Sequence, residues 1–498
     1  MTILNGYQPA HVVRYFEEIC AIPHPSHHEQ ALCAYIRGCA ERYGHRYVED
    51  AAGNLMVYLN ATPGYEDKAP MLLQAHMDMV SAKEPGSNHN FLTDPIRLHI
   101  EDGHYLYADD TTLGADNAVG LVNMLALMED DTVVHPPMEL LFTVCEEDGM
   151  EGIRQLDMST IHSRRMLNMD CGDPDVMCVS CAGFVHYVMR LPVTAAGAAG
   201  QAYTLQIDGL AGGHSGLMIG TGRASAVVLM GRVLCELLRK VPCRIVSVDC
   251  ERTMGIAPHM QAEIVLKPEQ EPDARKVLED LLAALREEYA NTDPELSLTL
   301  EPLGHEADQA MDEASGRRCA ELMYLLPYGV MKYDSCDRDV ILNSVNTVRV
   351  TCENGMVEYE QMIRSPIDAY KWELVDRLRI LAELTGASLV VQDSYAGWPF
   401  RKDSPLQQLC CQVYNRLTGQ ELKIEKLNSC AETGEIAGAI PDMDIVALAP
   451  WGRGAHTPRE HLDLDTLQPF WEFLTALLRA MCEEASAFVA FITIPDSV

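Results

Sequence analysis

The sequence predicts an α/β protein in which a mostly parallel sheet is covered by helices and interrupted by an inserted α+β domain. Strand-like and helix-like patterns alternate over the first 185 residues, an order typical of parallel sheets. From about His186 strands and helices follow one another in a mixed order, and beyond about Tyr395 the alternating pattern returns. We therefore expect segments 1–185 and 394–498 to form one α/β domain and segment 186–393 to be the insert.

In the first segment, Ser26-His27-His28-Glu29 has the pattern of a capping box that opens a helix ending near Tyr43. A second helix is predicted over Ala118–Met128, because apolar residues recur there at helical spacing. Four apolar runs are predicted to be strands: Asn54–Asn60, Met71–Val80, Glu139–Cys145 and Arg165–Met169.

The insert is predicted to contain strands and helices in no regular alternation. The expected strands are Tyr203–Ile207 and Leu296–Leu300, and the expected helices are Ala224–Val241, Asp273–Ala290 and Tyr370–Leu384. Val345–Thr351 and Met356–Ile363 flank Asn354-Gly355, a pair that favours the two positive φ angles of a tight hairpin turn. In the last segment we expect a strand over Asp444–Ala449 and a helix over Thr466–Cys482.

Composition excludes several classes of protein. The 498 residues are 48% hydrophobic, which excludes a disordered chain. Lys and Arg number 38 against 73 Asp and Glu, a net charge of −35 that disfavours nucleic acid and anionic membranes as partners. The longest apolar candidate, Ala485–Pro495, is shorter than the ~18 residues of a membrane span.

The 17 cysteines are an odd number scattered along the chain, which favours reduced thiols in a cytoplasmic protein. Cys178 and Cys181 form one CxxC pair, but a structural zinc site would need a second pair. We expect these two cysteines to be buried strand residues, with a redox role as the less favoured alternative.

The informative polar residues follow predicted strands. His76 and Asp78 are two residues apart at the end of an apolar run, so the carboxylate can orient the imidazole. Asp116 opens a predicted helix, where it could also be an N-cap. Glu146 and Glu147 end another strand, where they could also form a solvated acidic turn.

Asp170 follows a third strand, and His456 comes after a fourth through a glycine-containing loop. Ligands of open α/β sheets bind at the carboxyl ends of the strands, so we expect these side chains to lie close together. Two histidines and several carboxylates can hold two divalent ions bridged by one carboxylate, with another carboxylate acting as a base. The motifs GxxxxGK[ST], HExxH and GxSxG are absent from the sequence.

The order of these residues resembles the M20 metallopeptidases, and longer strings resemble their bacterial aminoacyl-histidine (Xaa-His, peptidase D) dipeptidase branch. The strings are Ile22-Pro23-His24-Pro25-Ser26, Leu73-Gln74-Ala75-His76-Met77-Asp78-Met79-Val80, Thr111-Thr112-Leu113-Gly114-Ala115-Asp116-Asn117, Cys181-Ala182-Gly183 and Gly212-Gly213-His214-Ser215-Gly216. The resemblance implies that the α/β domain is catalytic and that the insert is a lid. The insert, segment 186–393, is long enough either to form a homodimer or to supply His214 within one chain.

The resemblance also implies a role for each site residue. His76 and Asp170 would hold one metal ion, Glu147 and His456 the other, and Asp116 would bridge them. Glu146 would be the general base for a metal-bridging hydroxide, and Asp78 would support His76. His214 would polarise the scissile carbonyl, Arg364 would bind the substrate carboxylate, and Glu432 would lie near the substrate. Zinc is the expected metal, and manganese or cobalt also suits so oxygen-rich a set.

The sequence thus predicts a cytoplasmic di-metal dipeptidase acting on small peptides. An N-acyl-amino-acid amidohydrolase of the same fold would keep every ligand and is the first alternative. A non-catalytic peptide- or metal-binding protein is the second, although such a protein would be expected to lose the base at Glu146. Arg223 and the segment Asn428-Ser429-Cys430-Ala431 depart from the family pattern, so the preferred substrate side chain is not predicted.

Overall fold

The computed structural model describes residues 3–170, 173, 175–253, 255–450 and 452–484. The chain divides into two compact units: unit 1 comprises Met1–Ser180, Phe400–Leu427 and Glu435–Val498, and unit 2 comprises Cys181–Pro399 and Asn428–Gly434. The sequence interpretation placed the boundaries after residues 185 and 393 and assigned residues 428–434 to the last segment. The apolar tail Ala485–Val498 lies outside the described residues.

Unit 1 is built on a sheet that has eight strands among the described residues, in the order β1-β2-β6-β3-β7-β23-β8-β22. Their bounds are β1 Arg46–Glu49, β2 Leu55–Leu59, β3 Met71–His76, β6 Met138–Thr143, β7 Arg165–Asn168, β8 Val176–Cys178, β22 Lys423–Glu425 and β23 Asp444–Ala447. The central strands β6, β3, β7 and β23 are parallel. Every residue of β3, β6 and β23 is buried, as expected for parallel strands covered by helices. The predicted mostly parallel sheet is confirmed.

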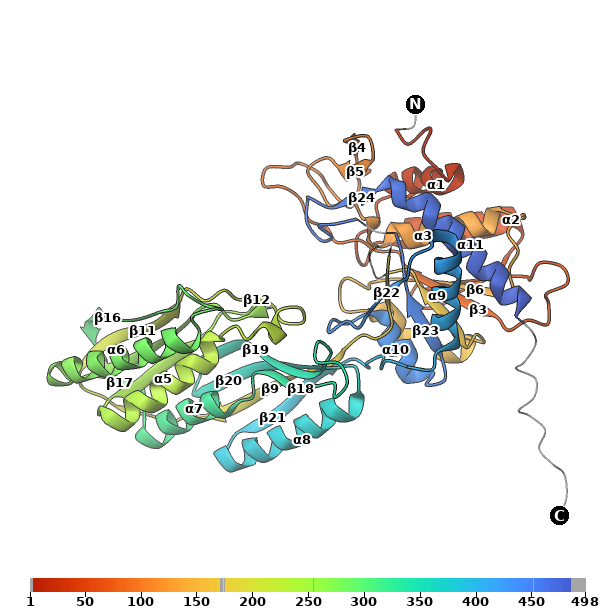
Figure 1. Ribbon diagram of the computed structural model, residues 1–498. Coiled ribbons are helices and arrows are strands. Elements are labelled where there is room, and N and C mark those ends of the chain that lie inside the picture. The colour runs from red at the N-terminus through yellow and green to blue at the C-terminus, as the bar shows by residue number, and fades with distance from the viewer. Residues whose placement is uncertain (1–2, 171–172, 174, 254, 451, 485–498) are drawn as a thin grey trace, which may run out of the picture. The chain divides into compact units, whose positions relative to one another are not determined.

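Helices surround this sheet (Figure 1). They are α1 Ala10–Cys20, α2 Gln30–Tyr43, α3 Ala115–Glu129, α4 Glu151–Gln155, α9 Pro405–Thr418 and α11 Leu467–Glu483, and α10 Glu432–Ala439 runs from unit 2 into unit 1. Helix α3 packs on β3 and against α1 and α2, while α9 packs on β23 and against α11. A small sheet of β4 Leu98–Glu101, β5 Tyr105–Ala108 and β24 His461–Asp463 completes the unit.

Unit 2 contains two antiparallel sheets with helices packed on them (Figure 1). One sheet comprises β13 Arg244–Asp249, β15 Met260–Leu266, β11 Gln201–Asp208 and β16 Ser297–Glu306, and the other β18 Gly329–Tyr333, β19 Ile341–Glu353, β20 Met356–Ser365, β9 Gly183–Pro192 and β21 Ser388–Ser394. Two short strand pairs are β10 Ala195–Gly197 with β17 Gln309–Met311 and β12 Gly213–His214 with β14 Gly255–Ile256. The helices are α5 Ala226–Lys240, α6 Glu271–Glu288, α7 Glu313–Leu325 and α8 Asp368–Thr385. The first sheet packs with α5 and α6 and the second with α8, which confirms the α+β character of the insert.

The predicted hairpin is the β19–β20 pair, with Glu353 opposite Met356. Asn354 has φ 52° and Gly355 has φ 75°. These are the two positive angles that the Asn-Gly pair predicts.

Two local predictions are wrong. The capping box is absent, because α2 begins at Gln30 without a side-chain cap and Ser26 Oγ instead donates to Asp78 Oδ2 at 2.7 Å. The strand predicted to reach Val80 ends at His76, where its pairing with β6 ends at Thr143. Beyond His76 the backbone makes single contacts: Met77 donates its N–H to the Thr143 carbonyl, and Met79 forms an isolated bridge with Pro25.

Within the described residues, no helix is long and apolar enough to cross a membrane. The cysteines that the structure describes are all free thiols. Cys178 and Cys181 are each 1% exposed, and burial raises the pKa of Cys181 to about 12, which opposes the thiolate that redox chemistry uses.

Candidate metal centre

The five predicted metal ligands all belong to unit 1. His76 is the last residue of β3, and Asp170 follows β7 by two residues. Asp116 lies in the first turn of α3, where its ψ of 100° departs from helical geometry. Glu147 lies in a turn after β6 rather than at the strand end that the sequence predicted, and His456 lies in the loop between β23 and β24.

Asp116 lies between two histidines. Its Oδ1 is 3.2 Å from His76 Nε2, and its Oδ2 is 3.3 Å from His456 Nε2. Each histidine meets a second carboxylate: His76 Nε2 is 3.4 Å from Asp170 Oδ1, and His456 Nε2 is 2.9 Å from Glu147 Oε1. The five side chains therefore form two His-carboxylate pairs that share one aspartate.

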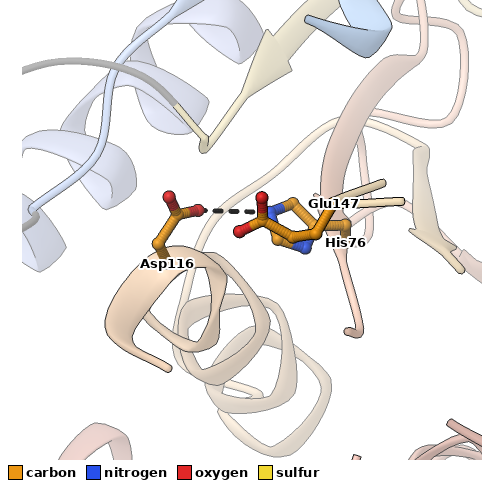
Figure 2. Close-up of side chains that lie close together, drawn as sticks. All are labelled: His76, Asp116 and Glu147. Atoms are coloured by element: carbon orange, nitrogen blue, oxygen red, sulfur yellow. Dashed lines mark hydrogen bonds and ion pairs between the residues drawn. The ribbon is translucent and has the colours of Figure 1, made fainter. Parts of the chain in front are cut away.

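Figure 2 shows His76, Asp116 and Glu147 directed toward a common point. One donor atom from each of these residues lies within 4.8 Å of the other two. Oε1 of Glu147 is buried and has no hydrogen-bond donor directed at it, although His456 lies nearby. Imidazole and carboxylate donors at this spacing fit a divalent cation.

The charges of the site also fit bound cations. Burial and the neighbouring Asp116 raise the pKa of Asp170 well above its usual range. Hydrogen bonds from His456 and His76 lower the pKa of Asp116, although burial opposes its ionisation. Carboxylates that are buried close together repel one another when all of them are ionised. The positive charge of bound divalent cations would offset this repulsion.

Asp78 connects the strand end that carries His76 to the turn that carries Glu146 and Glu147. Its side chain is 1% exposed. Oδ1 accepts the backbone N–H of Glu146 at 2.9 Å, and Oδ2 accepts that of Glu147 at 3.1 Å. The His76 ring faces it as well, with Nδ1 3.4 Å from Asp78 Oδ1 and 3.0 Å from the Asp78 carbonyl oxygen. A donor hydrogen on Nδ1 leaves the Nε2 lone pair for a cation.

A cavity of about 360 Å³ adjoins the ligands in unit 1. Asp116, Asp170 and His456 line one part of it. The remaining lining residues are Asn117, Val119, Met169, Asp173, Glu425, Leu427, Ala449 and Ala455. The cavity is therefore partly apolar and contains two carboxylates beyond the predicted ligands.

His214, predicted to polarise a carbonyl, lies in unit 2 on the short strand β12. Its Nδ1 is 3.2 Å from the backbone nitrogens of both Gly216 and Leu217, which donate to it. The ring proton is therefore on Nε2. Burial and the positive charge of Arg364 lower the pKa of His214, which favours the neutral ring. A Cβ at Gly216 would lie 2.7 Å from the Asn428 carbonyl oxygen and 3.0 Å from His214 Cε1, so glycine is needed there.

Arg364, predicted to bind a carboxylate, lies on β20 and is 9% exposed. Its Nη1 donates to Cys430 Sγ at 3.3 Å, and its buried Nε has no hydrogen-bond partner. Glu432, predicted to lie near the substrate, is the first residue of α10 and is 1% exposed. Arg364, Cys430 and Glu432 all belong to unit 2.

Sequence reasoning missed some polar residues of unit 1. Asp173 and Glu425 line the cavity, and Glu460 is a buried carboxylate that bonds to the backbone around Asp116. The sequence offered one signal, the position of Glu460 four residues after His456. This signal does not distinguish a buried glutamate from a solvated one, because both occur in polar loops.

A mostly parallel sheet, interrupted by an α+β insert, with imidazole and carboxylate groups gathered near the carboxyl ends of its strands, is typical of a metal-dependent hydrolase. The chain belongs to peptidase family M20/M25/M40, whose family model matches residues 72–480.

Individual relatives agree with this assignment. The cytosol non-specific dipeptidase of Escherichia coli (strain K12) is 31% identical over 482 residues, which cover 96% of this chain and 99% of that protein. The crystal structure of aminoacylhistidine dipeptidase from Vibrio alginolyticus matches with a TM-score of 0.89 at 31% identity, covering 96% of this chain and 98% of that one. Aminopeptidase PepT from Bacillus cereus shares the fold, with a TM-score of 0.58 and 16% identity over 96% of this chain and all of that one.

Proposed function

We propose that the chain is a dipeptidase that uses two divalent cations. The observation that carries the proposal is the position of Asp116, whose two carboxylate oxygens face two different His-carboxylate pairs. The relatives from Escherichia coli and Vibrio alginolyticus, both described as dipeptidases, support the substrate class.

Each ligand has an assigned cation. His76 and Asp170 would hold one, Glu147 and His456 would hold the other, and Asp116, which lies near both histidines, would serve both. Two imidazoles with three carboxylates suit zinc, and manganese and cobalt are the next choices. When bound, the cations polarise the scissile carbonyl and lower the pKa of the attacking water.

Glu146 is the general base in this proposal. It takes a proton from the water and later delivers it to the leaving amine. Its backbone N–H is held by Asp78 Oδ1 at 2.9 Å, which places it beside the proposed ligand Glu147.

His214 and Arg364 bind the substrate in this proposal. The Nε2–H of His214 donates to the carbonyl oxygen as negative charge develops there. Arg364 binds the free substrate carboxylate, for which its fork of N–H groups is suited. Glu432 is assigned to the same substrate-binding group.

The acidic lining of the cavity favours a dipeptide over an N-acyl amino acid. Asp173 and Glu425 line the cavity beside Asp116 and Asp170. A free ammonium group is the complementary partner, and an acylated amine lacks that charge.

A substrate panel tests the proposal. The purified protein, supplied with zinc, manganese or cobalt, is assayed on dipeptides and on the same dipeptides acetylated at the amine. We expect hydrolysis of the free dipeptides and little of the acetylated ones. Equal hydrolysis of both sets would favour the amidohydrolase, and the absence of turnover with every metal would favour a binding protein.

We also infer a cytoplasmic location and a small peptide as partner. The word cytosol in the name of the Escherichia coli relative and the free thiols of the described cysteines support the location. A homodimer stays a prediction, which the molar mass in solution would test.

A further inference from the structure

Glu460 is a buried acidic residue to which the proposed mechanism assigns no role. It is 4% exposed and lies four residues after His456. Its Oε2 accepts the backbone N–H groups of Leu113 at 2.8 Å and Gly114 at 2.9 Å. Its Oε1 accepts the backbone N–H of Asp116 at 3.2 Å. One carboxylate thus binds the loop that presents the bridging ligand.

The loop that carries His456 is closed by its own hydrogen bonds. Arg453 and His461 each donate a backbone N–H to the carbonyl of the other, both at 3.0 Å. Between them, the backbone N–H of Glu460 donates to the Thr457 carbonyl at 3.0 Å. Because the loop is braced in this way, a fixed Glu460 carboxylate also fixes the position of His456.

We propose that Glu460 is a positioning residue of the metal centre, which holds the His456 loop and the Asp116 loop at the spacing that lets both residues bind the same cation. The inference rests on the proposed two-cation site. Glu460 itself is not a ligand in this proposal, since its oxygens are directed at backbone N–H groups. Its role resembles that of other groups that orient metal ligands by hydrogen bonding.

Both the charge and the length of the side chain are needed for this role. Gln at position 460 keeps one oxygen and replaces the other with an NH₂ group, which would face an N–H donor. Asp keeps both oxygens but is one methylene shorter, so it cannot reach all three N–H groups. Glu460→Gln and Glu460→Asp therefore separate the geometric role from a purely electrostatic one.

Glu139 provides a matched control in the same unit. It is 3% exposed and accepts the backbone N–H groups of His162 and Ser163 at 2.9–3.1 Å. Its side-chain partners, the His162 ring and the Ser163 hydroxyl, are also outside the proposed ligand set. Glu139→Gln thus removes a buried carboxylate with backbone donors but leaves the metal centre unaltered.

The experiment measures zinc stoichiometry and affinity by competition with a chromophoric chelator, together with thermal unfolding and the circular dichroism spectrum. We expect the parent and Glu139→Gln to bind two zinc ions with equal affinity. We expect Glu460→Gln and Glu460→Asp to bind the weaker zinc ion about 10–100-fold less tightly, the usual cost of removing a group that orients a ligand.

Several outcomes would overturn the inference. Zinc affinity equal to the parent in both Glu460 variants would overturn it, as would equal losses in Glu139→Gln. Parent-like affinity in Glu460→Asp alone would show that the charge matters and the geometry does not. If Glu460→Gln fails to fold, Glu460→Asp decides the question. A parent that does not bind two zinc ions would refute the proposed function itself, which distinguishes that failure from failure of this inference.

Discussion

Asp78 holds the backbone of Glu146, with Oδ1 2.9 Å from the Glu146 nitrogen. The other oxygen of the same carboxylate holds the neighbouring Glu147. One buried aspartate therefore fixes both the proposed base and a proposed ligand, so their side chains start from a defined backbone. This arrangement makes the division of roles between Glu146 and Glu147 testable.

Glu146→Gln should keep both cations and lower kcat by at least ~10², the lower range for general acid–base catalysis. Glu147→Gln should instead lose a cation, because its Oε1 lies 2.9 Å from His456 Nε2 in the ligand cluster. Metal analysis of both variants, with kcat at saturating substrate, checks the prediction. Loss of metal in Glu146→Gln with retention in Glu147→Gln would reverse the two roles.

Asp116→Ala should reduce the content of both cations, whereas His456→Ala should reduce that of one. The reason is that Asp116 alone offers an oxygen to each His-carboxylate pair. Metal analysis of each variant, after gel filtration in a buffer with a low metal concentration, checks the prediction. Asp175→Asn is the control, because Asp175 pairs with Lys423 at 2.6 Å and should keep both. Equal metal loss in the Asp116 and His456 variants would argue against a bridging role.

Arg364→Lys should weaken hydrolysis of free dipeptides nearly as much as Arg364→Ala, by about 10–100-fold in kcat/KM, since a hydrogen bond to a charged group contributes ~1.5–3 kcal/mol. Lysine keeps the charge but loses the fork. Dipeptides with an amidated C-terminus should be poor substrates of the parent, and the discrimination should shrink in both variants. Arg190→Lys, on the adjacent strand β9 and paired with Glu358 at 2.7 Å, is the control. Equal cleavage of free and amidated dipeptides by the parent would refute the assignment.

His214→Ala should lower kcat by about 10²–10³ with little change in KM, the cost of removing one oxyanion donor. Because Nδ1 accepts the N–H groups of Gly216 and Leu217, only Nε2 carries a donor hydrogen. His214→Gln, which can place an amide N–H near the Nε2 position, should recover part of the rate, and His214→Leu should not. Steady-state kinetics of the three variants decides this. An effect confined to KM would mean that His214 binds substrate without stabilising the transition state.

Apolar periodicity was sufficient to predict the fold class and much of the central layer, but it did not predict helices α1, α7 and α9 or strands β9, β13 and β15. The buried runs of β3 and β6 and the helical spacing in α3 identified the central layer, and Asn354-Gly355 identified the β19–β20 turn. The ends of elements were less predictable, because they depend on partners distant in sequence. Ser26 illustrates this. The local sequence favoured a capping box at Ser26, but the Ser26 hydroxyl donates to Asp78, 52 residues away.

The five proposed ligands could be listed from the sequence because four of them lie at or after strands of one sheet, because Asp116 opens a helix, and because their order resembles a known family. What the sequence could not show is how they are supported. The backbone bonds of Asp78 and the three N–H groups collected by Glu460 join segments that are 68 and more than 340 residues apart. No local pattern marks such a contact, since a buried Glu and a solvated Glu occupy equally polar loops.

The order of strands also constrains how the chain is made. Strand β23 pairs with β7, although 275 residues separate Asn168 from Asp444. At a synthesis rate of about 5–20 residues per second, the edge of β7 stays without this partner for roughly 14–55 s. An unpaired buried strand edge is a template for pairing with other chains. The order of synthesis therefore leaves this edge of β7 open while the insert emerges. A chain that ended before Asp444 would contain seven of the eight described strands of this sheet but not β23, the partner of that edge.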